Sequence, residues 1–164
     1  MSAKPSGAAK GENKSLATNR KALHDFEVLQ RLECGLALRG TEVKVLRAGK
    51  ASLSGSYASV DKVTNEVWLE GVNIPTYEFG NLNNHDAHRR RKLLLHHREI
   101  LRLREHVEQK GNTLVPLSLY LKGGRVKCEL GVCRGKVEFD KRETIRKRDA
   151  DRDARRAMAH AIKR

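Results

Sequence analysis

Four consecutive basic residues, Arg89, Arg90, Arg91 and Lys92, could together bind phosphate groups. Guanidinium groups pair with phosphate oxygens through several hydrogen bonds at once. The run stands at the start of a predicted helix, where cations oppose the helix dipole and backbone N–H groups attract anions. A run of this kind is often only a solvated surface. The strongly basic composition of the chain favours the phosphate site.

The C-terminal segment 140–164 is a second concentration of charge, with ten Lys or Arg and five Asp or Glu. Its cations recur every three or four residues, which would align them along one side of a helix. Several alanines raise the helix propensity of the segment. An isolated helix of this composition is marginal in water, so we expect a tail that is disordered when free and helical when bound to RNA. The alternative is a tail that only aids solubility. The candidate cations are Lys141, Arg142, Arg146, Lys147, Arg148, Arg152, Arg155 and Arg156.

No residue pattern indicates catalysis or a metal site. The histidines at 85, 88, 96 and 97 lie beside an arginine run and not at the spacing of metal ligands, so we interpret them as polar surface residues. Cys128 and Cys133 are five apart in a predicted strand and should lie on opposite faces, which makes a shared metal or a bridge between them unfavourable. The sequence therefore predicts a protein that is not an enzyme and has no cofactor.

The chain has 164 residues and a formal net charge of +14. A charge of this size favours a polyanionic partner, with nucleic acid the first candidate and an anionic membrane the second. No apolar run is long enough to span a bilayer, and the N-terminus lacks the apolar core of a secretory signal. We expect a cytoplasmic protein with reduced cysteines.

Short strands dominate the predicted elements. Alternating apolar residues predict a strand near 24–33, two strands within 53–74 and a hairpin over 113–136 with its turn at Gly123–Gly124. A short helix is expected between Gly40 and Gly49, with Thr41 as its cap. Residues 89–111 predict a long helix in which Leu93, Ile100 and Val107 share one face and Leu94 widens the stripe. Short strands in a small basic domain favour an antiparallel β-barrel of the oligonucleotide-binding type over residues 19–139, after a disordered segment 1–18.

Four blocks carry a resemblance to a known family. They are GLALRGTEVKVLRAGKASLSGSY, NHDAHRRRKLLLHHREI, KGNTLVPLSLYLKGGRVKCELGVCRGK and DKRE. Together, and in this order, they resemble the SmpB family, from about residue 19 to residue 143. The resemblance implies an oligonucleotide-binding-type barrel with extra helices and a basic tail. It also implies a factor of trans-translation that binds the tRNA-like domain of transfer-messenger RNA and delivers it to stalled ribosomes.

The resemblance also implies which residues contact RNA. Glu33 stands at the family's acidic position, Leu94 within its leucine run, and His96 at the polar position that follows. Cys34 replaces the usual alanine, and His96 stands where some relatives have asparagine. For Leu94, packing in the core of the predicted helix is the competing interpretation.

For the tail, the resemblance implies a site in the ribosomal decoding centre and the empty mRNA channel. Phe139, just before the Asp140–Lys141–Arg142 motif, could stack on bases of 16S rRNA. The implied partners are transfer-messenger RNA, the small ribosomal subunit and elongation factor Tu, with the protein itself a monomer. The alternative function is a structural ribosomal protein with a basic arm. An RNA-processing enzyme would need catalytic residues, and the sequence suggests none.

Overall fold

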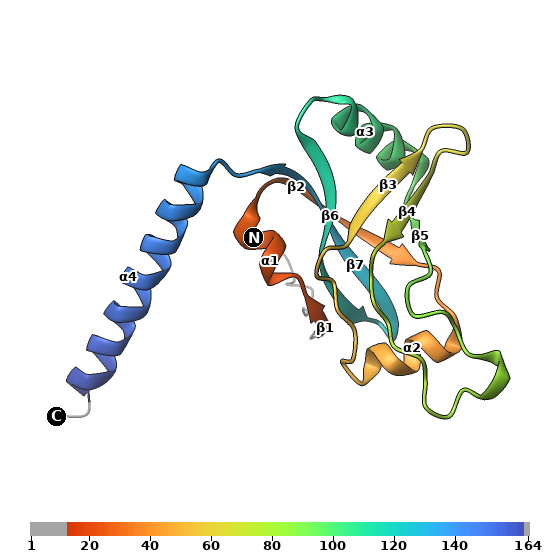
Figure 1. The fold of residues 1–164 in the computed structure, drawn as a ribbon, viewed down its shortest axis with the longest axis horizontal. Coiled ribbons are helices and arrows are strands. Elements are labelled where there is room, and N and C mark those ends of the chain that lie inside the picture. Colours follow the sequence, from red (N-terminus) through yellow and green to blue (C-terminus); the bar gives the residue numbers. More distant parts are fainter. Residues whose placement is uncertain (1–12, 163–164) are drawn as a thin grey trace, which may run out of the picture.

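The computed structural model describes residues 13–162. Seven strands and four α-helices make up this part of the chain (Figure 1). In chain order, the elements are β1 (Lys14–Thr18), α1 (Arg20–Asp25), β2 (Phe26–Leu36), α2 (Gly40–Arg47), β3 (Tyr57–Asp61), β4 (Glu66–Glu70), the 3-10 turn η1 (Asn81–Asn83), β5 (Arg91–Leu94), α3 (His97–Glu108), β6 (Asn112–Lys122), β7 (Arg125–Gly135) and α4 (Glu138–Ile162).

The strands form one antiparallel sheet in the order β1-β6-β3-β4-β5-β2-β7. Strand β6 also pairs with β7, so six of the strands close into a ring and β1 adds to β6 outside it. The ring is thinnest where β3 meets β6, at the single pair Ala58–Leu114, and where β5 meets β2. The predicted fold class, a small and mainly β antiparallel domain with additional helices, is confirmed.

The core fills the inside of this ring. Alternation along β7 and along β2 from Gln30 onward sends every second side chain inward, whereas a bulge between Val28 and Gln30 turns Phe26 and Val28 to the outside of the ring. Cys34 and Cys128 face each other across these two strands in the main core, whereas Cys133 belongs to a small second cluster under α1. Cys128 and Cys133 thus lie on opposite faces, as predicted. All three cysteines are buried and free.

Two boundaries differ from the sequence-based prediction. Residues 14–18, predicted to be disordered, form β1 and pair with the C-terminal half of β6, so the folded domain begins before residue 19. Residues 1–12 lie outside the described part of the chain. Helix α2 is capped by Arg39 and not by Thr41, whose hydroxyl instead lies 2.8 Å from Nδ1 of His85.

The predicted helix over 89–111 is wrong in its first half. Residues Arg91–Leu94 form strand β5, and α3 begins only at His97. Leu93 points into the core from a strand, with 1% of its surface exposed, while Leu94 points outward with 51% exposed. The basic run therefore does not stand at a helix N-terminus, and core packing of Leu94 is excluded.

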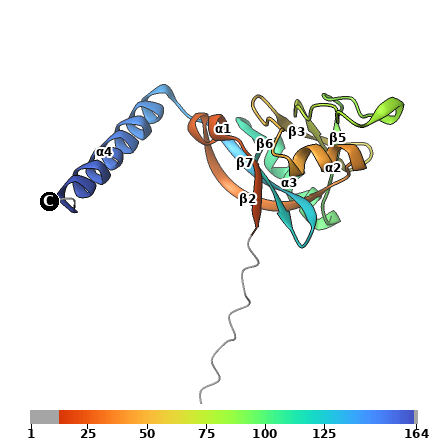
Figure 2. The same cartoon turned by 90° about the horizontal axis from the view of Figure 1, so that it is seen from below.

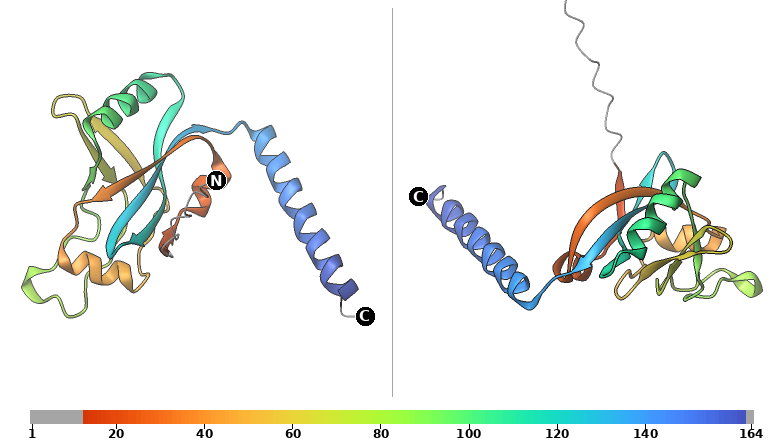
Figure 3. Two further views of the ribbon diagram at one scale, coloured as in Figure 1. Left: turned by 180° about the vertical axis from the view of Figure 1, so that it is seen from behind. Right: turned by 90° about the horizontal axis from the view of Figure 1, so that it is seen from above.

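Helix α4 projects from the body (Figures 1 and 2). It contacts the body at α1, and the backbone N–H of Lys136 donates to the Asp25 carbonyl, 3.0 Å away, just before the helix begins. Seen from behind, the long helix and the barrel are separated by a short connection (Figure 3). No helix within residues 13–162 is both long and apolar enough to cross a membrane.

Candidate nucleic-acid interface

Glu33, Leu94 and His96 line one open hollow of about 610 Å³ on the outside of the barrel. They come from β2, from β5 and from the residue that caps α3. The structure thus brings together three residues that are 61 and 63 positions apart in sequence. The other lining residues are Arg31, Leu32, Gly35, Leu95, Glu99 and Lys127.

The hollow opens where two strands part. Strand β5 pairs with β2 only at Gly35–Leu94 and Leu36–Leu93. Beyond Leu94 the chain turns away into α3, so no described strand covers this edge of β2 before Gly35. A Cβ atom on Gly35 would lie 3.2 Å from Cβ of Leu94, so the glycine lets Leu94 seat close to β2. The exposed Leu94 side chain therefore forms an apolar surface within an otherwise mainly polar hollow.

The Glu33 carboxylate is held by its own chain. It accepts a hydrogen bond from the Tyr120 hydroxyl at 2.6 Å and two from Nζ of Lys122 at 3.0 Å. The hydrogen bond from Tyr120, followed by those from Lys122, lowers the pKa of Glu33 below its usual value. Burial, with Glu33 the second cause, raises the pKa of Tyr120. Glu33 is therefore an oriented anion, suited to accept a hydrogen bond from a base or ribose hydroxyl and unsuited to phosphate.

His96 stands at the N-terminus of α3 with its side chain exposed. Its backbone N–H donates to Oε2 of Glu99 at 2.9 Å, which fixes the start of the helix beside the hollow. Its imidazole can donate and accept hydrogen bonds, as an asparagine amide can.

Lys127 and Arg31 are hollow residues that the sequence analysis missed. Both point outward from strands beside Glu33, since Lys127 is the register partner of Gly35 and Arg31 lies two residues before Glu33. Arg31 is partly engaged by Glu129 at 3.1 Å. Strand alternation already places Arg31 on the face of Glu33, and that signal alone could have found it.

The basic run at 89–92 does not form the predicted phosphate cluster. Arg91 is fully buried and its Nε donates to Oε1 of Glu42 at 2.8 Å. Arg89 donates two hydrogen bonds to the same carboxylate, from Nε at 2.8 Å and from Nη2 at 2.5 Å. The assignment of Arg91 to RNA is therefore wrong: its guanidinium is a core ion-pair partner. Arg89 acts in the same network and is three-quarters buried.

Burial would raise the pKa of Glu42, but hydrogen bonds from Arg89, from the Arg39 backbone and from Arg91 outweigh it, and the pKa lies below its usual value. Arg91 also donates to the backbone carbonyls of Val72, Arg89 and Ala87. This network ties the N-terminus of α2 to the loop that precedes β5.

The other two members of the run lie on the surface away from the hollow. The Arg90 guanidinium stacks 4.4 Å from the centre of the Trp68 ring, and Nζ of Lys92 contacts Glu66 at 2.5 Å. Arg90 and Lys92 therefore remain proposed RNA contacts, on a face of their own.

Of the four histidines predicted to lie on the surface, three are exposed and one is buried. His85, expected on the surface, is 2% exposed. Its Nε2 lies 3.0 Å and 2.9 Å from the carbonyls of Ile74 and Pro75. Carbonyls only accept, so Nε2 carries the proton and Nδ1 accepts from Thr41. His85 is a structural residue. No group of potential metal ligands is found among residues 13–162.

The tail is helical in the structure, and its cations are spread around α4. Arg148, Arg152 and Arg155 line one shallow hollow together with Asp151, so these three share a side. Arg152 and Arg156 lie 3.8 Å and 3.9 Å from Asp149 and Asp153, three residues earlier in each case. Lys141, Arg142, Arg146 and Lys147 complete the predicted set in the same helix. The side chains of Phe139 and Asp140 lie outside the described part of the chain.

Circular dichroism can measure directly how helical the tail is when no RNA is bound. We expect far-ultraviolet circular dichroism of the full chain, minus that of a chain ending at Phe139, to correspond to a small fraction of a 25-residue helix, because an unpacked helix is marginal. The difference should grow on addition of ribosomal RNA. A full helical signal without RNA would contradict the predicted disorder.

The comparisons with known proteins decide the family. The family model described as SmpB protein matches residues 16–160. The chain belongs to the SmpB family. SmpB relatives named SsrA-binding protein include that of Bifidobacterium longum strain DJO10A, 53% identical over 148 residues, or 90% of this chain and 93% of the relative. The relative in Corynebacterium urealyticum is 49% identical over 96% of this chain and 93% of its own length.

A solved SmpB structure has the same fold. It is described as "tmRNA-SmpB: a journey to the center of the bacterial ribosome" and is 48% identical, with a TM-score of 0.63 over 79% of this chain and 93% of the solved one. The SmpB family predicted from the four sequence blocks is therefore confirmed.

Proposed function

We propose that the chain is an RNA-binding factor of trans-translation. It binds the tRNA-like domain of transfer-messenger RNA through the hollow of Glu33, Leu94 and His96 and carries that RNA to stalled ribosomes. The observation that carries the proposal is the convergence of these three residues on one hollow. The names of the relatives, SsrA-binding protein, and the solved complex with transfer-messenger RNA and the ribosome support it.

The hollow suits an RNA loop better than a duplex. An exposed leucine offers an apolar surface to an unstacked base, while an oriented carboxylate and an imidazole offer hydrogen-bonding groups to base edges. The Lys127 side chain makes no hydrogen bond or ion pair within the described residues, although its charge helps to lower the pKa of Glu33, so its ammonium group is available to a phosphate. The site acts by shape and charge and requires no catalytic group, and we propose a binding factor that is not an enzyme.

On the ribosome, α4 would lie along 16S rRNA in the decoding centre and the empty mRNA channel. The candidate contacts are Phe139, Asp140, Lys141, Arg142, Arg146, Lys147, Arg148, Arg152, Arg155 and Arg156. We further propose that the protein acts as a cytoplasmic monomer, within a delivery complex that includes elongation factor Tu.

Substitution of Glu33 by alanine tests the RNA site. We expect about a tenfold loss of affinity for the tRNA-like domain, as for removal of one charged hydrogen-bond partner. Glu33 is 39% exposed and lies outside the core, so the thermal melt should be unchanged. Filter binding or fluorescence titration measures the affinity.

The matched control is Glu27→Ala. Glu27 is an exposed glutamate on the same strand, six residues from Glu33 and outside the hollow. Its loss should not affect RNA binding. Equal affinities for Glu33→Ala, Glu27→Ala and the unchanged protein would refute the assignment of the site. Sequencing the RNA captured with the protein from lysate would separate it from a ribosomal protein, which would retain rRNA without a tRNA-like RNA.

A further inference from the structure

We propose that a second hollow, next to the Glu33 site, accepts one unstacked RNA nucleotide, with the base on aliphatic side chains and the phosphate on Arg125 and Lys127. That its ligand is RNA rests on the proposed function. The position of the nucleotide is a separate claim, and it rests on Leu36, Leu38, Val43 and Arg125, which that function does not use.

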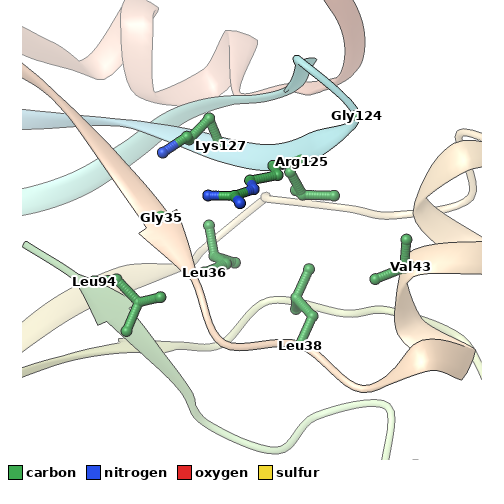
Figure 4. Close-up of a pocket in the computed structure, with 9 residues that line it drawn as sticks. Gly35, Leu36, Leu38, Val43, Leu94, Gly124, Arg125 and Lys127 are labelled. Atoms are coloured by element: carbon green, nitrogen blue, oxygen red, sulfur yellow. The ribbon is translucent and has the colours of Figure 1, made fainter.

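The second hollow has a volume of about 360 Å³ (Figure 4). Leu36 and Leu38 come from the end of β2 and the segment after it, Val43 comes from α2, and they face the start of β7. Its remaining lining residues are Gly35, Leu94, Gly124, Arg125, Val126 and Lys127. The size falls within the range of pockets that hold small molecules and is sufficient for one base.

The two hollows form a continuous surface. Both are lined by Gly35, Leu94 and Lys127. Leu94 stands between them as an exposed apolar wedge from β5. An RNA strand that crosses this wedge would place neighbouring nucleotides on its two sides, one beside Glu33 and His96 and one beside Leu38 and Val43.

The charge of the second hollow selects the occupant. Its lining includes two cations and no carboxylate. Neither the Arg125 nor the Lys127 side chain makes a hydrogen bond or ion pair within residues 13–162. Aliphatic carbon stacks against a base of any sequence, and unpaired cations attract the phosphate attached to it. An apolar peptide would leave both cations unused.

The wall formed by the β6–β7 turn is fixed before any ligand binds. Gly123 and Gly124 adopt φ values of 58° and 74°, which side chains disfavour and a tight turn needs. Nη2 of Arg47, on α2, lies 3.5 Å from the Gly124 carbonyl and links the turn to the opposite wall. A preformed hollow lowers the ordering cost of binding.

Two substitutions test the proposal in the full chain. Val43→Phe fills the hollow without changing charge, and Arg125→Gln removes an exposed cation. Each should lower affinity for the tRNA-like domain about tenfold, the scale of one stacked base or one charged contact. The matched controls are Val63→Phe, at a position 91% exposed in the β3–β4 turn, and Lys110→Gln, at an exposed lysine after α3. Both should bind as tightly as the unchanged protein.

Nuclear magnetic resonance supplies a readout that is independent of the whole RNA. Nucleoside 5′-monophosphates should shift the methyl signals of Leu36, Leu38 and Val43, and inorganic phosphate should not. Normal RNA affinity in both Val43→Phe and Arg125→Gln, with weakened binding in Glu33→Ala, would overturn the second hollow and leave the proposed function intact. No effect of any of the three would overturn both. Methyl shifts with an acidic peptide and none with nucleotides would mean that the occupant is wrong.

Discussion

Removal of residues 140–164 should abolish peptidyl transfer to charged transfer-messenger RNA on stalled ribosomes while leaving RNA binding nearly intact. Both proposed RNA hollows lie in the barrel, and no strand of the described chain extends past Gly135. The removed segment contributes little burial, since Met158 and Ile162 are 67% and 85% exposed. A modest loss of RNA affinity at low salt is expected from the ten lost cations. Transfer on ribosomes stalled without a stop codon measures the effect.

A charge variant separates the role of the cations from that of the helix. Arg148, Arg152 and Arg155 share one side of α4, so replacing all three by glutamine removes a local charge and keeps the chain length. We expect this variant to bind transfer-messenger RNA normally and to transfer slowly. Normal transfer by the truncated chain would instead make the tail a solubility segment.

Glu42→Gln should destabilise the fold by about 3–5 kcal/mol, because it leaves the buried Arg91 without its counter-charge. For a chain of this length, about 2–4 °C of melting temperature are lost per kcal/mol, so a decrease of roughly 10 °C is expected. Calorimetry or denaturant titration measures the loss. Glu78→Gln is the control, since Glu78 is 73% exposed and pairs with Lys50 at 3.4 Å on the surface.

The stabilisation that Glu42 provides should be lost at acid pH and retained at neutral pH. The folded-state pKa of Glu42 is lowered, so its stabilisation is complete above the unfolded-state value of about 4.3 and is lost as pH falls through the folded-state pKa. The difference between the unchanged protein and Glu42→Gln should be constant near neutral pH and shrink only below about pH 4. Equal melting temperatures at neutral pH would show that the network adds nothing to stability.

The sequence predicted the strands that alternate and both hairpins, one of which turns at Gly123–Gly124. It failed at 91–94 because three consecutive leucines after four basic residues fit a helix as well as a strand. The decision is made by pairing with Gly35 and Leu36 on β2 and with residues 67–69 on β4, and these contacts are distant in sequence. The register then sends Arg91 inward and Leu94 outward.

The same limit explains the outcome for the candidate site. Glu33, Leu94 and His96 came from a family resemblance, and only the fold shows that they share a hollow. Adjacent basic residues suggested one phosphate cluster, but a strand sends neighbours to opposite faces, and Glu42 binds two of the four. Glu42 lies 49 positions from Arg91, so the residues around Arg91 in the sequence do not indicate that its partner is a buried carboxylate.

The joint at Gly135–Val137 makes the barrel and α4 interchangeable parts. Past Thr144, whose hydroxyl lies 3.4 Å from Nζ of Lys136, all described residues of α4 are exposed, so we expect changes there to leave the packing of the barrel unaltered. Substitutions at residues 145–162 should therefore carry no folding penalty, and selection on them could follow the proposed ribosomal RNA partner alone. A hybrid that joins this barrel to the tail of another family member should fold as well as either parent, and any defect in such a hybrid would measure how far tail and ribosome have diverged together.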